Sequence, residues 1–313
     1  MGVLVSRLGG EHIPASAELW RSANLARRQA VGLDTIEEAA PALDRPGAFG
    51  VGVFDGDVLV SAGVAMPARA DDGRSEHNIP GLAHISTVAT RPNRWGEHLA
   101  VIALQAVMSQ ARRRGFARCQ LWTFASNPGA RRLYEREGFQ LSSRTRSHER
   151  QGEQMVHYLQ ELTAPAVISR PAARIVCLDD RDRVLLMHWR DPVDGHQLWE
   201  PPGGGLEADE APREAALREW VEETGLPAPE LIGEPTTVAR DVFWNGGRLV
   251  TDEVFFLARM PSARTLEPTG FTQIESQSYL GHAWVGRSEL VDLEAAGDPV
   301  EPDLPPVLHR LGA

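Results

Sequence analysis

The chain has 313 residues, about twice the most common domain length, which predicts two domains of ordinary size. Its 42% hydrophobic and 24% charged residues are typical of a globular protein and exclude disorder as the main state. No run approaches the ~20 apolar residues of a membrane helix, and residues 1–7 lack the features of a secretory signal. We therefore expect a cytoplasmic protein with no membrane contact.

The charged residues are distributed unevenly. All 32 residues counted as Lys or Arg are Arg, which excludes lysine-dependent chemistry such as a Schiff base. Residues 1–163 carry a formal charge of +2 and the rest −13, so the second half repels a nucleic-acid polymer and suits a divalent cation. The two cysteines, Cys119 and Cys177, lie far apart without CxxC spacing, so we expect buried thiols.

A segment with two prolines and several small residues separates the halves. It predicts a linker at 164–171 between domains 1–163 and 172–313. Each half alternates strand and helix patterns, so both domains are expected to be α/β (α+β).

In the first half, apolar runs at 48–54 and 58–64 flank a turn at 55–57 and predict a hairpin. Apolar spacing of three and four over 98–114 predicts an amphipathic helix that ends at Gly115. The other predicted elements are helices at 15–31 and 129–137 and strands at about 84–89, 119–124 and 154–159.

The second half also alternates between predicted strands and helices. The predicted strands are 174–178, 184–188, 238–243, 251–258 and 283–285, with a helix at 211–224 and a helical turn at 305–310. Residues 201–205, Pro-Pro-Gly-Gly-Gly, are expected to form a loop, because prolines and glycines interrupt regular structure.

The helix at 211–224 gathers three carboxylates, Glu219, Glu222 and Glu223, because residues three and four apart share a helix face. Arg218 can pair with Glu222, but one guanidinium cannot neutralise three carboxylates. Mg²⁺ or Mn²⁺ with oxygen ligands is the natural counter-charge. For such a cluster standing alone, a solvated acidic face is the alternative.

The spacing of the residues around this cluster favours a metal site over a solvated acidic face. The pattern is Gly204, five residues, Glu210, seven residues, Arg218-Glu219-Trp220, one residue, Glu222-Glu223, one residue, Gly225-Leu226. It resembles the Nudix box of pyrophosphohydrolases that act on nucleoside-diphosphate-linked substrates, which implies an α/β/α sandwich. Trp220 replaces the usual aliphatic residue, and we expect it to alter packing more than chemistry.

Carried over by position, the resemblance implies that Glu219, Glu222 and Glu223 bind the metal, with the Gly204 carbonyl as a further ligand. One of the glutamates would orient or deprotonate the attacking water, while the metal neutralises the pyrophosphate oxygens and lowers the pKa of bound water.

The resemblance also implies supporting residues. Arg218 and Glu210 would form an ion pair that holds the loop and the helix together. Other family members recruit a further acid from outside the box, for which Glu253 and Glu275 are candidates, with an ordinary surface role as the alternative.

Residues 127–139, which follow the strand at 119–124, resemble the C-terminal motif of the GNAT N-acetyltransferases. The order of predicted elements over about 1–160 is similar too, which implies a mixed sheet with flanking helices. The resemblance implies that Tyr134 protonates the departing thiolate of coenzyme A and that Asn127 lies beside the cofactor. Alternatively, Tyr134 is a core residue.

The acetyl-CoA loop of that family departs from its pattern here. The aligned residues after Val88 are Trp95-Gly96-Glu97-His98-Leu99-Ala100, and we expect Val88, Gly96 and Ala100 to contact the cofactor. Trp95 replaces the usual Arg/Gln, His98 replaces a glycine, and Glu97 adds negative charge, for which Arg91 and Arg94 could compensate. His84 and Glu76 are candidates for a general base.

The main hypothesis is a cytoplasmic fusion in which a Nudix domain hydrolyses a small nucleotide substrate with Mg²⁺ or Mn²⁺, joined to a GNAT-like domain for acetyl-CoA and an amine acceptor. Two alternatives stay open. One is an acetyltransferase with a nucleotide-sensing Nudix-like domain. The other is a Nudix hydrolase with an inactive GNAT-like module for ligand binding or homodimer formation.

Overall fold

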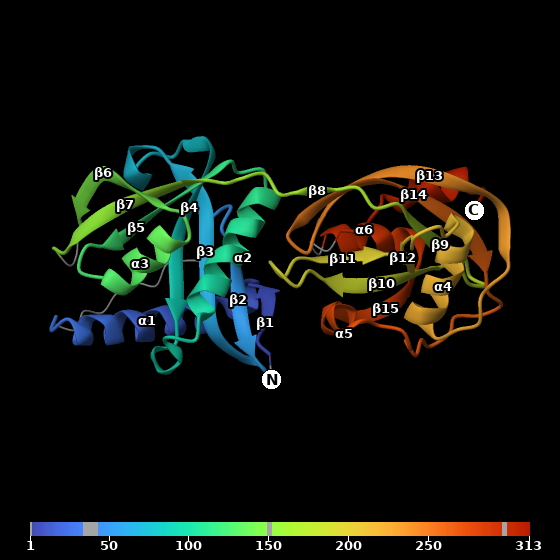
Figure 1. Ribbon diagram of the computed structural model, residues 1–313, viewed down its shortest axis with the longest axis horizontal. Coiled ribbons are helices and arrows are strands. Elements are labelled where there is room, and N and C mark those ends of the chain that lie inside the picture. Colours follow the sequence, from blue (N-terminus) through green and yellow to red (C-terminus); the bar gives the residue numbers. More distant parts are fainter. Residues whose placement is uncertain (1, 34–42, 149–151, 296–298) are drawn as a thin grey trace. The chain divides into compact units, whose positions relative to one another are not determined.

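A computed structural model describes residues 2–33, 43–148, 152–295 and 299–313 (Figure 1). The chain divides into two compact units. The first comprises Met1–Pro165 with Val193–Gly195, and the second Ala166–Pro192 with His196–Ala313. Both units combine a sheet with helices, which confirms the expected fold class.

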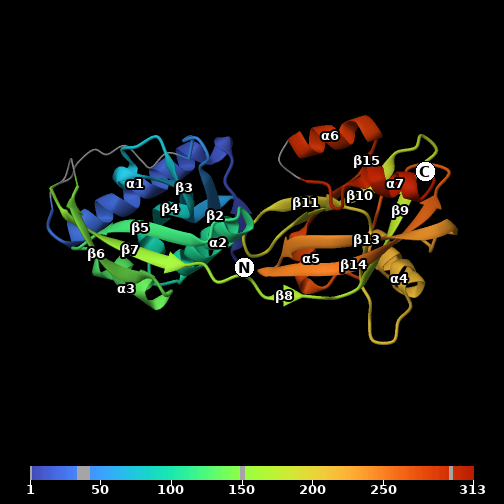
Figure 2. The same cartoon turned by 90° about the horizontal axis from the view of Figure 1, so that it is seen from above.

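The first unit is built on a seven-stranded sheet of order β1-β2-β3-β4-β5-β7-β6. Its strands are β1 (Leu4–Arg7), β2 (Phe49–Asp55), β3 (Val58–Arg69), β4 (Asn78–Thr90), β5 (Arg118–Phe124), β6 (Gln140–Ser147) and β7 (Gln154–Glu161). Its helices are α1 (Ile13–Ala30), α2 (Leu99–Arg113) and α3 (Pro128–Arg136), with short 3₁₀ turns η1 (Gly10–His12), η2 (Asp71–Gly73) and η3 (Pro92–Arg94). Figure 2 shows α1 on one face of this sheet and α2 and α3 on the other.

The parallel pair β4–β5 creates an opening in this sheet. Pairing stops at Ile85 and Leu121, although β4 continues to Thr90 and β5 to Phe124. Helices α2 and α3 follow these two strands, so both begin beside the gap between the strand ends. In open α/β sheets, ligands bind outside the carboxyl ends of parallel strands.

The second unit contains an eight-stranded mixed sheet with the central order β11-β10-β9-β14-β13. Its strands are β8 (Val167–Ile168), β9 (Ala172–Leu178), β10 (Val184–Arg190), β11 (Gln197–Glu200), β12 (Gly203–Gly205), β13 (Leu231–Trp244), β14 (Gly247–Arg259) and β15 (Tyr279–Val285). Its helices are α4 (Pro212–Thr224), α5 (Gln273–Ser278), α6 (Arg287–Ala295) and α7 (Leu304–Arg310).

Helices cover both faces of this second sheet. On β9, Ile175 and Cys177 pack in the cluster that contains Trp220 of α4, whereas Val176 and Leu178 pack with α6 and α7. Successive strand residues point to opposite faces, so β9 is buried between two helical layers (Figure 2). The α/β/α sandwich is therefore confirmed, and Trp220, fully buried, replaces an aliphatic side chain within the core.

One expectation needs correction. Residues 203–205 form a strand rather than a loop, because glycines can pair closely with β9: a Cβ at Gly203 would collide with the Ala173 carbonyl oxygen. Within the expected linker, Val167 and Ile168 pair with β14. A two-residue exposed strand has no periodicity that the sequence could reveal.

The buried thiols are confirmed, since Cys119 and Cys177 are both buried and free. In the described parts of the chain, every helix is too short or too polar to cross a membrane.

Candidate functional site

Helix α4 places Glu219 and Glu223 against the glycine strand β12, with Glu222 beside Arg218. Burial of Ala215, Ala216 and Trp220 against the sheet fixes the rotation of the helix. The helix ends where Gly225 adopts a left-handed conformation with φ of +68°. The local sequence therefore sets which residues of α4 lie near β12.

Glu223 is the most deeply placed of the three. Its Oε2 accepts a hydrogen bond of 2.9 Å from the Gly203 N–H. Burial holds the pKa of Glu223 well above its usual value, and Glu200 and Glu219 act in the same direction, while Arg174 and the Gly203 N–H oppose them.

Glu219 lies against Gly204. A Cβ on Gly204 would come within 2.7 Å of the Glu219 carboxylate, so only glycine permits this approach. Burial raises the pKa of Glu219, and the nearby charges of Glu222 and Glu275 add to the shift, against the opposing effect of Arg218.

Arg218 joins the helix to the preceding loop. Its Nε and Nη2 donate to the two carboxylate oxygens of Glu210 at 2.8 and 2.9 Å, as the sequence predicted. This bidentate contact lowers the pKa of Glu210 to about 2. Arg218 also donates from Nη1 to Glu219 and Glu222 at 2.9 and 3.1 Å, so one guanidinium faces three carboxylates.

These residues fit a divalent cation. Glu219, Glu222 and Glu223 are hard oxygen donors, and the first two share one guanidinium. The missing side chain at Gly204 leaves the Glu219 carboxylate directly beside the backbone of β12. The observed donor set is therefore suited to Mg²⁺ or Mn²⁺.

The two candidates for a further acid differ. Glu253 is buried and bound by the Arg174 Nε at 2.9 Å and by the Arg240 Nη1 at 2.8 Å, which lowers its pKa despite burial. Glu275 caps α5 by accepting from the Thr272 N–H at 2.7 Å, and its charge acts on Glu219. Glu275 is thus the candidate with an electrostatic connection to the α4 carboxylates.

Arg174 was not predicted as a site residue from the sequence. Its Nη1 donates to the carbonyls of Pro201 and Gly203 at 3.0 and 3.1 Å, and its Nη2 lies 3.0 Å from Glu200. Arg174 therefore supports the strand that carries the glycines. Its partners are distant in sequence, so no local spacing signalled this role.

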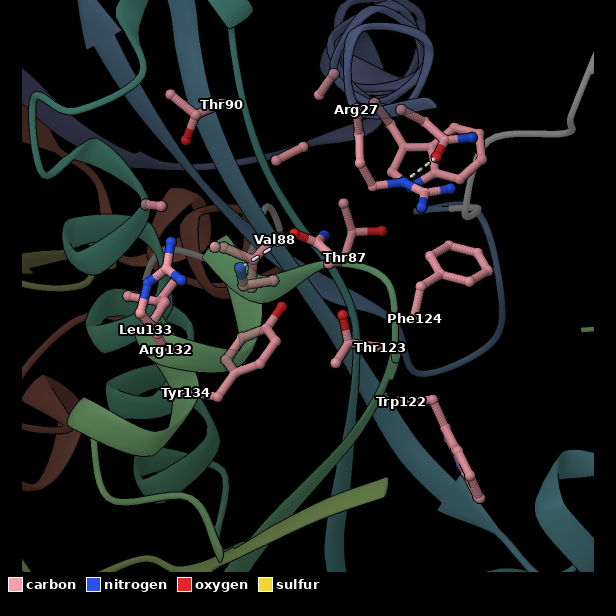
Figure 3. A pocket seen from close by; sticks show the side chains of 18 of the residues that line it. Arg27, Thr87, Val88, Thr90, Trp122, Thr123, Phe124, Arg132, Leu133 and Tyr134 are labelled. Carbon is pink, nitrogen blue, oxygen red and sulfur yellow. Dashed lines mark hydrogen bonds between the residues drawn. The ribbon is translucent and has the colours of Figure 1, made fainter. Parts of the chain in front are cut away.

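The first unit holds a cavity of about 1150 Å³ where β4 and β5 part. Figure 3 shows Arg132, Leu133 and Tyr134 on one side of it and Arg27, Trp122 and Phe124 on the other, with Val88 between them. Val88, Gly96, Ala100, Asn127 and Tyr134 all line this cavity, so the structure brings together the predicted cofactor residues.

Tyr134 and Asn127 lie on or beside α3. The Tyr134 side chain is buried, its hydroxyl points into the cavity in Figure 3, and burial raises its pKa. The Asn127 side chain accepts a hydrogen bond of 3.2 Å from the Ala130 N–H and caps α3. Tyr134 thus combines core packing with access to the cavity.

The loop before α2 carries the sequence departures. His98 adopts the left-handed conformation with φ of +61°, which residues other than glycine rarely adopt. Arg94 binds both oxygens of Glu97 at 2.8 and 2.7 Å and also contacts Asp55 at 2.9 Å. Arg94 therefore neutralises Glu97, while the Arg91 Nε donates to the Leu59 carbonyl.

The two candidates for a general base, His84 and Glu76, lie in different environments. His84 lines the cavity, but burial, followed by the charge of Arg146, lowers its pKa to about 4. Glu76 is exposed and is not among the described lining residues.

Comparison with known proteins matches each half of the chain to a protein family. The sequence model of the NUDIX domain matches residues 168–308. A relative, the RNA pyrophosphohydrolase of Cereibacter sphaeroides, is 33% identical over 134 residues, covering 39% of this chain and 78% of the relative. The chain belongs to the Nudix family. Nudix hydrolase 25 of Arabidopsis thaliana is 28% identical over 150 residues, covering 44% of this chain and 83% of that protein.

The model of the Acetyltransferase (GNAT) family matches residues 16–139, so the Nudix protein also carries a GNAT domain. Among solved structures, a ribosomal-protein-alanine N-acetyltransferase from Brucella melitensis aligns with a TM-score of 0.41 at 15% identity, covering 51% of this chain and 99% of that one. Nudix hydrolases depend on divalent metal ions and GNAT enzymes use acetyl-CoA.

The raised pKa values of Glu219 and Glu223 predict a pH-dependent response to metal. The unfolded chain releases these protons at lower pH than the folded protein, so the two groups reduce metal-free stability as pH rises through their folded pKa values. A metal at 100 times its dissociation constant adds about 2.7 kcal/mol to the free energy of unfolding, which is enough to raise the melting temperature by several degrees. Millimolar Mg²⁺ should raise the melting temperature relative to EDTA, more at pH 7.5 than at pH 5.5.

Differential scanning calorimetry of the full chain measures this shift. The double variant Glu222→Gln/Glu223→Gln should lose most of it, whereas Glu230→Gln, at an exposed position, should keep it. Equal melting temperatures with and without metal in the native chain would contradict the proposed metal face.

The strained His98 yields a second prediction. Glycine takes φ of +61° without the ~1–2 kcal/mol penalty of an L residue and lets the backbone approach a phosphate. His98→Gly should therefore bind acetyl-CoA several-fold more tightly than the native chain in calorimetry. Gly96→Ala, at φ of +91°, should bind it more weakly. Tight native binding with no gain in His98→Gly would show that the loop is not impaired.

Proposed function

We propose that the Nudix domain hydrolyses a pyrophosphate linkage in a small nucleoside-diphosphate-linked substrate with Mg²⁺ or Mn²⁺. The observation that carries this proposal is the contact of the Glu219 carboxylate with Gly204, beside Glu222 and Glu223. A bound divalent ion would neutralise the substrate oxygens and activate water for attack on phosphorus.

Residues of this chain would bind the ion, accept the proton of the water and hold the loop in place. Glu219, Glu222 and Glu223 would hold the ion, with the Gly204 carbonyl as a further ligand, and one of these carboxylates would accept the proton of the attacking water. The water oxygen bonds to phosphorus while the bridging P–O bond breaks and the leaving phosphate departs. Arg218 positions Glu219 while its bidentate pair with Glu210 holds the loop.

The similarity to an RNA pyrophosphohydrolase makes RNA the competing substrate. The formal charge of −13 over residues 164–313 favours a small nucleotide, because each additional phosphate of a polymer meets the same repulsion. A substrate panel distinguishes the two.

The decisive assay incubates the full chain with Mg²⁺ and nucleoside triphosphates, ADP-ribose, diadenosine polyphosphates, nucleotide sugars or 5′-triphosphorylated RNA. Glu223→Gln, which keeps an acceptor for the Gly203 N–H but loses a charge, should lower turnover of the best substrate by about 10- to 100-fold or more. Glu230→Gln serves as the matched control. A loss below tenfold in Glu223→Gln at saturating Mg²⁺ would overturn its assignment.

For the GNAT domain, the cavity that gathers Val88, Gly96, Ala100, Asn127 and Tyr134 supports a second proposal, transfer of an acetyl group from acetyl-CoA to an amine. The neutral amine nitrogen bonds to the thioester carbon and loses a proton to solvent, the C–S bond breaks, and Tyr134 donates a proton to the departing sulfur. The raised pKa of Tyr134 keeps that proton on the hydroxyl before transfer. We also propose cytoplasmic residence and domains at 1–163 and 172–313.

A further inference from the structure

Several residues that line the cavity of the GNAT domain carry a buried polar atom without a hydrogen-bond partner. Among the residues that the structure describes, Nδ1 of His84, Oγ1 of Thr87 and Nδ1 of His148 have none. A buried polar group without a partner costs free energy in the folded protein, so each such atom requires an explanation. His84 and Thr87 lie on the same strand, β4, and together they point to a ligand.

The side chains of His84 and Thr87 project from the same face of the sheet, the one that α1 covers. Ile85 packs in the core cluster with α2, so the residue before it, His84, points to the opposite face. Ala89 packs in the cluster with α1, and Thr87, two residues earlier, shares its face. A bulge at Ser86 in the pairing of β3 with β4 allows two residues three apart to share one face.

This face is the side of the cavity from which an acceptor would approach. Val88 packs in the α2 cluster, and in Figure 3 Thr87 lies between Val88 and Phe124. The acetyl transfer proposed above places the departing sulfur beside Tyr134 of α3. The α1 side of the cavity, with Thr87 and His84, is therefore left for the acceptor.

The ring of His84 offers a lone pair to the cavity. Burial is the main cause that lowers its pKa to about 4, so the ring is uncharged near pH 7. A hydrogen bond with the backbone of Gln120 opposes this shift, and it belongs to Nε2 because Nδ1 has no partner. A bond that favours the charged ring is donated by a ring N–H to a carbonyl. The proton therefore lies on Nε2, and Nδ1 is an acceptor that requires a donor.

A ring with this pKa is a weak base near pH 7, so His84 is suited to binding an acceptor rather than to removing its proton. The group that His84 binds is an uncharged donor. Burial disfavours a cation here, because none of the described lining residues is Asp or Glu.

The hydroxyl of Thr87 is the second contact. Its side chain is only 6% exposed, and a hydroxyl can both donate and accept a hydrogen bond. Thr90 lies on the same strand and lines the same cavity, but its Oγ1 is 2.8 Å from Oγ of Ser61. The two threonines thus differ in whether the hydroxyl has a partner within the protein.

We propose that the acceptor of the GNAT domain is an amine that carries an uncharged hydrogen-bond donor, a hydroxyl or an amide group, which donates to Nδ1 of His84 while the hydroxyl of Thr87 bonds to the same acceptor. This inference rests on the acetyl transfer proposed above. The two contacts hold the acceptor on the α1 side, with its neutral amine directed to the thioester.

A pair of threonine variants tests whether the Thr87 hydroxyl is unpaired. Thr87→Val removes the hydroxyl and keeps the shape, so the melting temperature of the full chain should stay the same or rise. Thr90→Val loses the contact with Ser61 and should lower the melting temperature of the GNAT domain. An equal fall in both variants in scanning calorimetry would show that the Thr87 hydroxyl is already bonded and would overturn its assignment.

Heteronuclear NMR of the full chain with labelled histidine tests the ring of His84. The resonances of this ring are assigned by their loss in His84→Asn. Near pH 7 the ring should be neutral with its proton on Nε2, since the carbonyl of Gln120 holds it there. A charged ring, or a proton on Nδ1, would overturn the assignment of His84 as an acceptor.

Matched acceptors test the donor group. Ethanolamine is compared with propylamine, and glycinamide with glycine methyl ester, and thiol release from acetyl-CoA gives kcat/KM. The acceptor with the donor should exceed its partner by at least about tenfold in one pair, because a missing donor leaves a buried acceptor unpaired. The pair that responds identifies a hydroxyl or an amide. Equal rates within both pairs, or a preference for propylamine or the ester, would overturn the inference.

The threonine variants then locate the contact. For the preferred acceptor, Thr87→Val should raise KM by about 2- to 10-fold, the range for one neutral hydrogen bond, and leave KM for acetyl-CoA unchanged. Thr90→Val should leave both values of KM unchanged. An equal rise in KM for the acceptor in both variants would overturn the role of Thr87.

Calorimetry with acetyl-CoA separates this inference from the function on which it rests. Failure of acetyl-CoA to bind would contradict acetyl transfer, and the melting and NMR experiments would still decide whether the two polar atoms are unpaired. Binding of acetyl-CoA without thiol release to any of these acceptors, or without preference for the donor group, would contradict only the inference.

Discussion

The close approach of three consecutive glycines to their neighbours organises the Nudix domain. A Cβ at Gly203 would collide with β9, and one at Gly204 would collide with the Glu219 carboxylate. Without these side chains, β12 pairs with β9 and also contacts α4, which brings the Gly203 N–H to Glu223. The backbone thus sets the separation between the loop and the carboxylates on which metal binding depends.

The two domains use opposite charges at their candidate sites. In the Nudix domain, carboxylates exceed the guanidinium charge of Arg218, and burial raises the pKa of Glu219 and Glu223. In the GNAT domain, six arginines are among the described residues that line the cavity. Unbalanced charge of either sign costs stability in the free protein and favours a ligand of opposite charge.

The sequence predicted what depends on local spacing. The face of α4 and its end at Gly225 follow from helix periodicity and turn chemistry, and both were observed. The pair of Arg218 with Glu210, which the resemblance to the Nudix box implies, was observed too. His98 stands where the resembled family has a glycine, and the structure gives this residue a positive φ. The assignment of site residues to catalysis and binding stays a prediction.

Other features depend on tertiary contacts that no local pattern encodes. Arg174 and Glu253 pair across 79 residues, and strand β12 forms only because β9 lies beside it. The opening between β4 and β5 depends on where their pairing stops, which hydrophobic periodicity does not specify. The cationic lining of the cavity likewise appears only when α1, β4, β5 and β6 are assembled.

The most direct test of the metal site is a titration of Mn²⁺ into the native chain and Gly204→Ala, with free Mn²⁺ read by electron paramagnetic resonance. The native chain should remove Mn²⁺ from solution. Gly204→Ala should bind it at least about tenfold more weakly while retaining a native near-ultraviolet circular dichroism spectrum, because the added Cβ displaces Glu219 from a donor set that needs accurate placement. Undiminished Mn²⁺ binding by a folded Gly204→Ala variant would contradict the account.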